Sequence, residues 1–328
     1  MDERQQQLVE WAAGALGIDD WVISTVSADA SFRRYFRGQK GASSWILVDA
    51  PPDREDSDAF CAIAARLANA GLVVPEVLAR DAGRGFLVLS DLGDRVLLQA
   101  LQAGPSETQV EQHVGQALAA LVTLQSKADA SGLPPYDERL LRQELALFPD
   151  WYLARERGQS FSTAEQADWE AACDCLVASA LEQPRVFVHR DFMPRNLMVT
   201  DRGPGIIDFQ DAVRGPVTYD LVSLFRDAFI SWPESRIESW CAAYREQAEA
   251  AGIALPADLQ QSMDLMGMQR HLKVIGIFSR LKHRDGKPHY LPELPRFFDY
   301  LHAALQRQGH VVALQGLAGL LEKYRSAA

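Results

Sequence analysis

The sequence is poor in cysteine and has no long apolar run. Its four cysteines show neither a C-x-x-C pair nor the spacing of a zinc finger, which argues against a disulfide framework or a cysteine-based metal site. No apolar run approaches the roughly 18 residues that a membrane span requires. The chain opens on polar and acidic residues, where a secretory signal would place an apolar segment. These absences predict a cytoplasmic protein whose cysteines are ordinary thiols.

Positive charge is also scarce. Lysine and arginine together number 33 against 44 acidic residues, which gives a formal net charge of −11. Nucleic acids and anionic membranes are bound through basic surfaces, so neither is an expected partner. The length of 328 residues suits about two domains and a sizeable core.

The first part of the chain mixes strand and helix signals. Ser57 is a plausible N-cap, and Gly71 stands where a left-handed residue would end the helix. Aromatic and β-branched runs predict strands, and apolar residues at helical spacing predict helices. The expected helices cover 6–16 and 57–70, and the expected strands lie at 21–23, 35–36, 45–48, 73–74 and 86–89.

The remainder of the chain has mainly helical patterns. Capping boxes at Ser106 and Ser162 begin two helices, and residues 234–251 and 259–283 supply two more. Residues 90–94 resemble a connector between the two parts. We therefore predict an α+β fold with a small antiparallel-sheet N-lobe at 1–92 and a larger, mostly helical C-lobe at 93–328.

The most informative segment runs from 186 to 210. An apolar strand at its start presents Asp191 on a loop, which Pro194 stiffens. Two short strands, 197–199 and 206–207, follow on either side of a Gly- and Pro-rich turn. Such a hairpin brings Asp208 beside Asn196, although they are twelve positions apart.

The three oxygen-bearing side chains of this segment suit phosphoryl transfer. Asn196 and Asp208 provide the hard oxygen ligands that Mg²⁺ prefers, alongside the phosphates of a substrate. Asp191 remains available to accept a hydrogen bond from a hydroxyl nucleophile. The competing reading makes all three ordinary turn and cap residues. The H-R-D-x-x-x-x-N motif, two strands and I-I-D-F in that order favour catalysis.

These motifs resemble those of the aminoglycoside phosphotransferase/choline kinase superfamily, and the resemblance covers nearly the whole chain. Matching segments include 73–78, 86–93, the catalytic segment and 215–221. The resemblance implies a protein-kinase-like fold, ATP and Mg²⁺ as cofactors, and adenine binding by Ser90, Asp91 and Leu92. It also implies that His189 and Asp220 support the catalytic loop.

A narrower resemblance, carried by residues 28–37 and 269–276, is to the kinases of cell-wall recycling. Those enzymes phosphorylate the anomeric hydroxyl of N-acetylmuramate and N-acetylglucosamine. The alternatives are a kinase for choline, an aminoglycoside or another hydroxyl acceptor, and a catalytically silent nucleotide-binding protein.

Two features of the superfamily are missing. The phosphate-covering loop at 27–32 has no glycine, although small residues such as Ser31 still allow close approach of backbone to phosphate. The strand at 45–49 lacks the expected lysine. Either Asp58 or Glu55 would be the acid that pairs with the replacing cation. The cations that could replace the lysine are Arg33, Arg34, Arg37 and Lys40.

The acceptor pocket is expected near the helix at 265–287. Four basic residues there share one helix face, which suits an acidic acceptor but equally describes a solvated surface. His271 lies off this face and is expected in the core. The four basic residues are Arg270, Lys273, Arg280 and Arg284. Four further candidates for sugar or phosphate contacts are Arg190, Arg195, Gln210 and Arg214.

Overall fold

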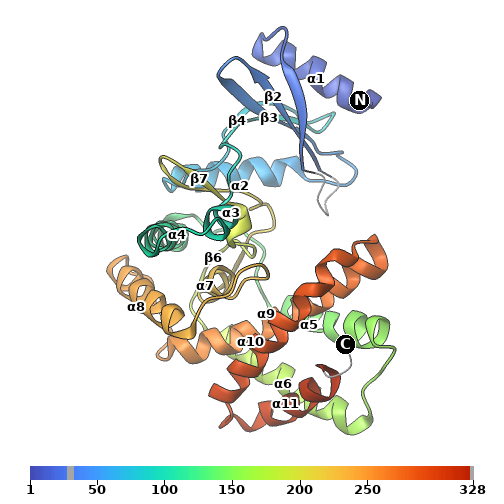
Figure 1. The fold of residues 1–328 in the computed structure, drawn as a ribbon, viewed down its shortest axis with the longest axis vertical. Helices are drawn as coiled ribbons and strands as arrows, with labels where there is room; N and C mark the ends of the chain where they lie inside the picture. The colour runs from blue at the N-terminus through green and yellow to red at the C-terminus, as the bar shows by residue number, and fades with distance from the viewer. Residues whose placement is uncertain (28–32, 326–328) are drawn as a thin grey trace. The chain divides into compact units, whose positions relative to one another are not determined.

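The structure is a computed structural model that describes residues 1–27 and 33–325 (Figure 1). The chain forms two compact units, each assembled from two stretches of sequence. The first unit contains Met1–Asp129 and Arg195–Asp211, and the second contains Ala130–Pro194 and Ala212–Ala328. The chain thus passes from one unit to the other within the predicted catalytic segment. The lobe boundary expected after residue 92 stays a prediction.

The first unit is built on a five-stranded antiparallel sheet with the strand order β1-β2-β3-β5-β4. Leu8 and Ala12 of helix α1 pack against Phe36 on one face of this sheet. Because side chains alternate along a strand, Tyr35 and its partner Val48 lie on the opposite face. The strands are β1 (Val22–Ser27), β2 (Arg34–Lys40), β3 (Ser43–Asp49), β4 (Val77–Asp81) and β5 (Phe86–Ser90), and α1 spans Glu3–Leu16.

Two predicted details of this unit are wrong. Helix α2 (Ser57–Asn69) is capped by Asp56, whose carboxylate accepts the amides of residues 58 and 59, so Ser57 is the first helical residue. No strand forms at 73–74: Val73 makes only an isolated bridge to Gly205, and the strand begins at Val77. Pro75 explains the shift, because it has no N–H to donate to a ladder.

The first unit continues through two helices and a hairpin. The hydroxyl of Ser106 accepts the amide of Gln109, whose side chain accepts the amide of Ser106, so the predicted capping box is confirmed. In the hairpin, Leu197 pairs with Ile206, and the Ile206 amide donates to the Val73 carbonyl at 2.8 Å. These elements are α3 (Leu97–Gln102), α4 (Glu107–Lys127), β7 (Leu197–Thr200) and β8 (Gly203–Ile206).

The second unit is mainly helical and is organised around the long helix α9 (Leu259–Asp285), most of which is buried. A Cβ atom at Gly276 would lie 2.3 Å from the carbonyl carbon of Leu147, so only glycine allows this approach of α9 to the chain before η1. The other elements are α5 (Glu138–Leu145), the π-helix η1 (Phe148–Glu156), α6 (Thr163–Glu182), β6 (Arg185–Val188), β9 (Val213–Pro216), α7 (Tyr219–Phe225), α8 (Glu234–Ala250), the 3₁₀ turn η3 (Pro288–Glu293), α10 (Leu294–Arg307) and α11 (Val312–Arg325).

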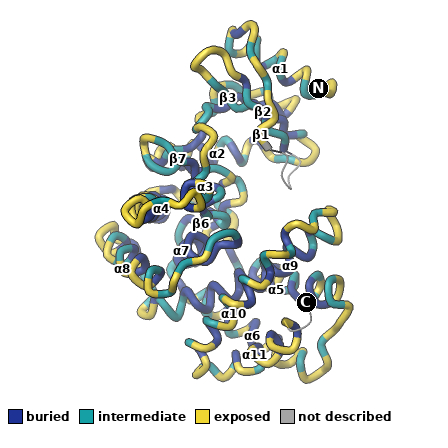
Figure 2. The backbone as a smooth tube through the Cα atoms, in the orientation of Figure 1, coloured by how far each residue is buried: buried dark blue, intermediate teal, exposed yellow. Residues whose placement is uncertain are grey.

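The outer helices follow the spacing expected of amphipathic elements. In α8, Ile237, Trp240, Cys241 and Tyr244 are buried, while the other positions between 237 and 244 are exposed or partly exposed, and Figure 2 shows buried and exposed stretches alternating along this helix. None of the helices in the described residues combines the length and the apolar character needed to cross a membrane.

Candidate active site

The loop after β6, which the sequence predicts to be catalytic, is held by Asp220 at the start of α7. One carboxylate oxygen of Asp220 accepts the amide of His189 at 2.6 Å, and the other accepts the amide of Arg190 at 3.0 Å. Burial raises the pKa of Asp220 to about 7, and the nearby charge of Asp191 adds to the rise, while the two amides oppose it. Asp220 therefore contacts the loop in the way that the resemblance implies.

Asp191 itself sits in a tight turn after β6. Its amide donates to Nδ1 of His189 at 3.2 Å, and its carbonyl accepts the amide of Met193 at 2.9 Å. His189 is fully buried and packs edge-on against Phe192. The preceding residue, Arg190, has φ = 73°, a conformation that side chains other than glycine adopt only at a cost. Such strain is typical of functional loops.

In the first unit, Asn196 and Asp208 lie side by side, as the hairpin predicted. Nδ2 of Asn196 is 3.4 Å from Oδ2 of Asp208, and the Ile207 amide donates to the Asn196 carbonyl at 3.1 Å. Asp208 is exposed and has φ = 64°. The next residue, Phe209, is buried and stacks on Phe60 of α2 at 4.9 Å. The buried ring fixes the strained turn that presents the Asp208 carboxylate.

This pair fits a metal that is shared with a ligand. Among the described residues, no group of three or more His, Cys, Asp or Glu side chains could hold a metal by itself. Asp208 offers an exposed carboxylate and Asn196 an amide oxygen, which suits Mg²⁺, because this ion usually takes one or two protein ligands together with phosphates and water. Gln210, a predicted substrate contact, instead donates its side-chain amide to Oδ1 of Asp208 at 2.8 Å.

The four cations that could replace the missing strand lysine have different partners in the structure. Only Arg33 pairs with one of the two candidate acids, at 3.1 Å from Glu55. The other acid, Asp58, pairs with Arg80. The remaining cations are engaged elsewhere: Arg34 lies 2.7 Å from Asp49, Arg37 lies 2.6 Å from Asp91, and Lys40 donates to the Asp19 carbonyl at 2.6 Å.

Arg33 and the candidate metal ligand Asp208 both act electrostatically on Tyr35. Arg33 is buried, with 6% of its surface exposed, and it donates a hydrogen bond to the hydroxyl of Tyr35. Burial raises the pKa of Tyr35 to about 12; the charge of Arg33 opposes this rise, whereas Asp208 and Glu55 add to it. The charges of Arg33, Glu55 and Asp208 thus all influence the Tyr35 hydroxyl, and Tyr35 lies on the same sheet face as Val48.

The expected adenine-binding residues occupy a hydrogen-bonded connector after β5. The Ser90 amide donates to the Glu76 carbonyl at 2.9 Å, so it is not available to a ligand. The Asp91 carboxylate accepts from Arg37 and from the Gly93 amide at 3.0 Å. The Leu92 amide is used by no hydrogen bond within the described residues. Ser31, the expected phosphate contact, lies outside them.

A buried carboxylate missed by the sequence analysis gathers several groups of the second unit. Glu144 of α5 accepts from Arg190, Tyr136 and Gln269, and lies 2.8 Å from Lys273. Burial would raise its pKa, but the two cations lower it to about 2. Arg190 and Lys273, both predicted substrate contacts, therefore share Glu144 as a carboxylate partner. The sequence does contain one signal for this residue, because Glu144 lies on the same helix face as the apolar Leu141, where a carboxylate is expected to be buried and paired.

The other acceptor candidates occupy unlike surroundings. Arg270 is buried, so the alternative of a solvated basic face is wrong for it and for Lys273; Arg284, in contrast, is exposed and pairs with Asp285. Arg214 is exposed on β9 and Arg195 belongs to the first unit. His271 is buried and stacks on Tyr300, as expected for a core residue.

Comparisons with known proteins agree with this arrangement. Residues 22–255 match the model of the phosphotransferase enzyme family. The chain is 53% identical to the N-acetylmuramate/N-acetylglucosamine kinase of Pseudomonas aeruginosa, over 98% of this chain and 97% of that one. It is 40% identical to the protein of the same name from Neisseria meningitidis, over 96% and 95%.

Solved structures confirm the predicted two-lobed, kinase-like fold. A choline kinase from Streptococcus pneumoniae superposes with a TM-score of 0.65 at 12% identity, covering 92% of this chain and 100% of that one. An ADP-bound aminoglycoside phosphotransferase gives a TM-score of 0.59 at 14% identity, covering 93% and 99%. Because the family model matches most of the chain and the two kinases align over nearly its whole length, the chain belongs to the phosphotransferase enzyme family.

Proposed function

We propose that this enzyme transfers the γ-phosphoryl group of ATP to the anomeric hydroxyl of N-acetylmuramate or N-acetylglucosamine. The observation that carries the proposal is the catalytic loop braced by Asp220, in a chain that is 40–53% identical to kinases named for these two sugars. The proposed compartment is the cytoplasm.

In this mechanism Asp191 orients the acceptor hydroxyl and takes its proton as the new O–P bond forms. Asn196 and Asp208 would hold Mg²⁺, which would neutralise negative charge on the phosphates of ATP. Asp220, by holding the two loop amides, fixes the direction of the Asp191 carboxylate. Most of the catalysis is positioning and charge stabilisation by these prearranged groups.

The nucleotide is bound by other groups of the first unit. The amide of Leu92 is the proposed contact for adenine, and the Ser90–Asp91 segment shapes the connector around it. Arg33, held by Glu55, is the proposed phosphate-binding cation in place of the strand lysine, because it is the one candidate paired with a candidate acid. Ser31 remains a proposed phosphate contact.

The test is ADP release with ATP and Mg²⁺ against N-acetylmuramate, N-acetylglucosamine, choline and kanamycin. We expect turnover confined to the amino sugars. In Asp191→Asn, turnover should fall about 10²–10⁴-fold with an unchanged melting temperature, because the variant keeps the shape and loses the base.

A second readout identifies the hydroxyl. Phosphorylation at the anomeric position blocks ring opening, so the reducing-end signal of the sugar should disappear in step with ADP release. Turnover on choline or kanamycin, or loss of ATP without loss of the reducing end, would contradict the proposal. ATP binding without any turnover would identify a silent nucleotide-binding protein.

A further inference from the structure

Arg270 is a buried cation with two guanidinium nitrogens that have no hydrogen-bonding partner among the described residues. Only 3% of its surface is exposed, and its Nε and Nη1 atoms make no hydrogen bond within the part of the chain that the structure describes. One turn further along α9, Lys273 is also buried but is fully engaged, at 2.8 Å from Glu144 and 3.0 Å from the Tyr219 hydroxyl. The two buried cations of this helix are therefore not equivalent.

The residue before Arg270 is linked to the loop that holds Asp191 through Glu144, which accepts from both Gln269 and Arg190. The positive charge of Arg270 favours the ionised form of Asp220, which in turn is affected by Asp191. The two oxygens of Asp220 accept the amides of His189 and Arg190, and no hydrogen bond joins Asp220 to the guanidinium of Arg270 among the described residues. Buried N–H groups of a guanidinium that donate to no acceptor are costly, so this position favours an anion that arrives with a ligand.

A second buried atom next to Arg270 also lacks a partner. Gln269 donates its side-chain amide to Glu144 at 3.1 Å, but its Oε1 atom accepts no hydrogen bond among the described residues. Buried polar groups are almost always paired, so a donor and an acceptor left open on adjacent residues indicate a polar ligand. Glu144 cannot serve Arg270, because Arg190 and Lys273 already occupy it.

We propose that Arg270 binds a carboxylate of the acceptor, the group that the lactyl ether of N-acetylmuramate carries and N-acetylglucosamine lacks. This inference rests on the proposed function and adds the residue that discriminates between the two sugars. Gln269 Oε1 accepts an N–H of the same ligand. A guanidinium suits this role, because it offers two parallel N–H groups to a carboxylate.

The test compares kcat and KM for both sugars in the parent enzyme, in Arg270→Gln and in the control Arg284→Gln. Arg284 lies on the same helix but is exposed and pairs with Asp285. In Arg270→Gln, KM for N-acetylmuramate should rise about ten- to hundred-fold, as expected when a charged hydrogen bond is lost. KM for N-acetylglucosamine and for ATP should change less than about two-fold, and the control should match the parent.

The methyl ester of N-acetylmuramate provides an independent test, because it removes the negative charge from the substrate and leaves the protein unchanged. The parent should prefer the acid to its ester, and Arg270→Gln should lose that preference, while Arg270→Lys should keep part of it. Equal losses on both sugars would assign Arg270 to support of the loop and overturn the inference. A raised KM for ATP alone would assign it to the phosphoryl group, and a parent that does not distinguish acid from ester would also overturn it. A parent that phosphorylates neither sugar would instead refute the proposed function.

Discussion

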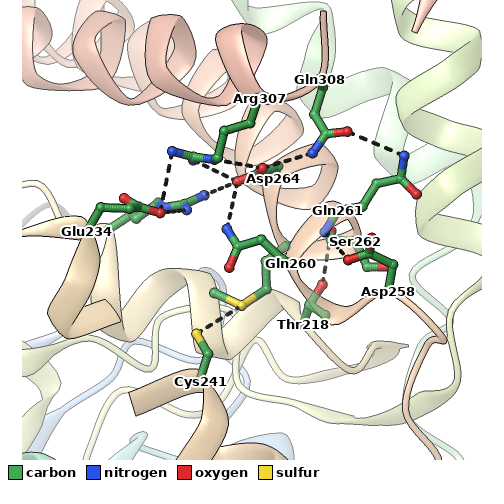
Figure 3. A network of polar contacts seen from close by, with 12 residues as sticks. Thr218, Glu234, Cys241, Asp258, Gln260, Gln261, Ser262, Asp264, Arg307 and Gln308 are labelled. Carbon is green, nitrogen blue, oxygen red and sulfur yellow. Dashed lines mark hydrogen bonds and ion pairs between the residues drawn. The ribbon is translucent and has the colours of Figure 1, made fainter. Parts of the chain in front are cut away.

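Helix α9 carries two buried charge clusters only six residues apart, and they differ in how completely they are satisfied. The first surrounds Asp264, which has no exposed surface (Figure 3). Its carboxylate accepts from Arg226 at 2.9 Å, from Arg307 at 2.9 and 2.8 Å, and from Gln308 at 3.0 Å. These partners come from α7, α10 and the residues that follow them, so the cluster ties separate elements of the second unit together.

The second cluster surrounds Arg270 and has open positions. Its Nε and Nη1 atoms and the Oε1 atom of Gln269 lack partners among the described residues. A buried polar network that satisfies itself stabilises one arrangement, whereas a partly satisfied one is costly unless a ligand completes it. Burial of charge alone therefore does not mark a binding site. Open hydrogen-bonding capacity beside a catalytic loop does.

The largest loss of stability is expected from a substitution that removes the carboxylate at the centre of the Asp264 cluster. In Asp264→Ala, the buried Arg226 loses one of its two carboxylate partners and keeps Glu234, and removing one member of a buried pair costs about 3–5 kcal/mol of unfolding free energy. Urea unfolding measures this loss. The folded fraction should retain the parent KM for both sugars, because Asp264 contacts no catalytic group. A raised KM with unchanged stability would contradict the structural role.

The next largest effect is a pH dependence of stability that comes from Glu144. This carboxylate is buried and fully hydrogen-bonded, like Asp264, but it contacts Arg190 of the catalytic loop. Its pKa is lowered from 4.5 to about 2, because attraction to Lys273 and Arg190 outweighs burial. Ionised Glu144 therefore stabilises the fold above about pH 4.5, by roughly 3 kcal/mol, and this stabilisation is lost as the pH falls toward 2.

Urea unfolding of the parent and Glu144→Gln at pH 6 and pH 3 tests this dependence. The stability difference between the two proteins should shrink by more than half at pH 3. A difference that does not change with pH would mean that Glu144 contributes through packing and neutral hydrogen bonds.

The sequence predicted best what is local in the chain. Asn196 and Asp208 could be placed together because a tight hairpin fixes their distance, and the motif around Asp191 could be recognised because it is contiguous, while the role of Asp191 stays a prediction. The capping boxes at Ser106 and Ser162 were found for the same reason, since each is closed within three residues. The cap of α2 was misplaced by one residue, because Asp56 and Ser57 are both good capping residues.

What the sequence could not predict depends on distant partners. Glu144 meets Gln269 across 125 positions, and no local pattern encodes that contact. Arg33 could not be chosen from four cations until the structure showed which of them already have other partners. The strand at 73–74 was predicted from β-branched residues alone, although the backbone of Val73 is used by the hairpin instead.

A smaller effect is expected for Asp208, which is exposed and therefore contrasts with both buried clusters. Asp208→Asn is the informative change, because asparagine tolerates the positive φ of this position and alanine does not. Loss of the charge should lower turnover on the order of 10²-fold and raise the Mg²⁺ concentration needed for half-maximal activity. An Mg²⁺ titration of the parent and the variant measures this, and identical titrations would exclude Asp208 as a metal ligand.

The smallest effect concerns Arg33, a buried cation with an identified acid partner. Arg33→Gln should raise KM for ATP about ten-fold, because one charged hydrogen bond to phosphate is lost, and Arg33→Lys should recover part of that loss. The matched control is Arg34→Gln. Arg34 is adjacent in sequence but pairs with Asp49, on the sheet face that α1 covers, so its loss should lower the melting temperature without changing KM for ATP. If the two variants instead lose stability alike and keep the parent KM, then Arg33 is a structural cation like Arg226, and the nucleotide is neutralised from elsewhere.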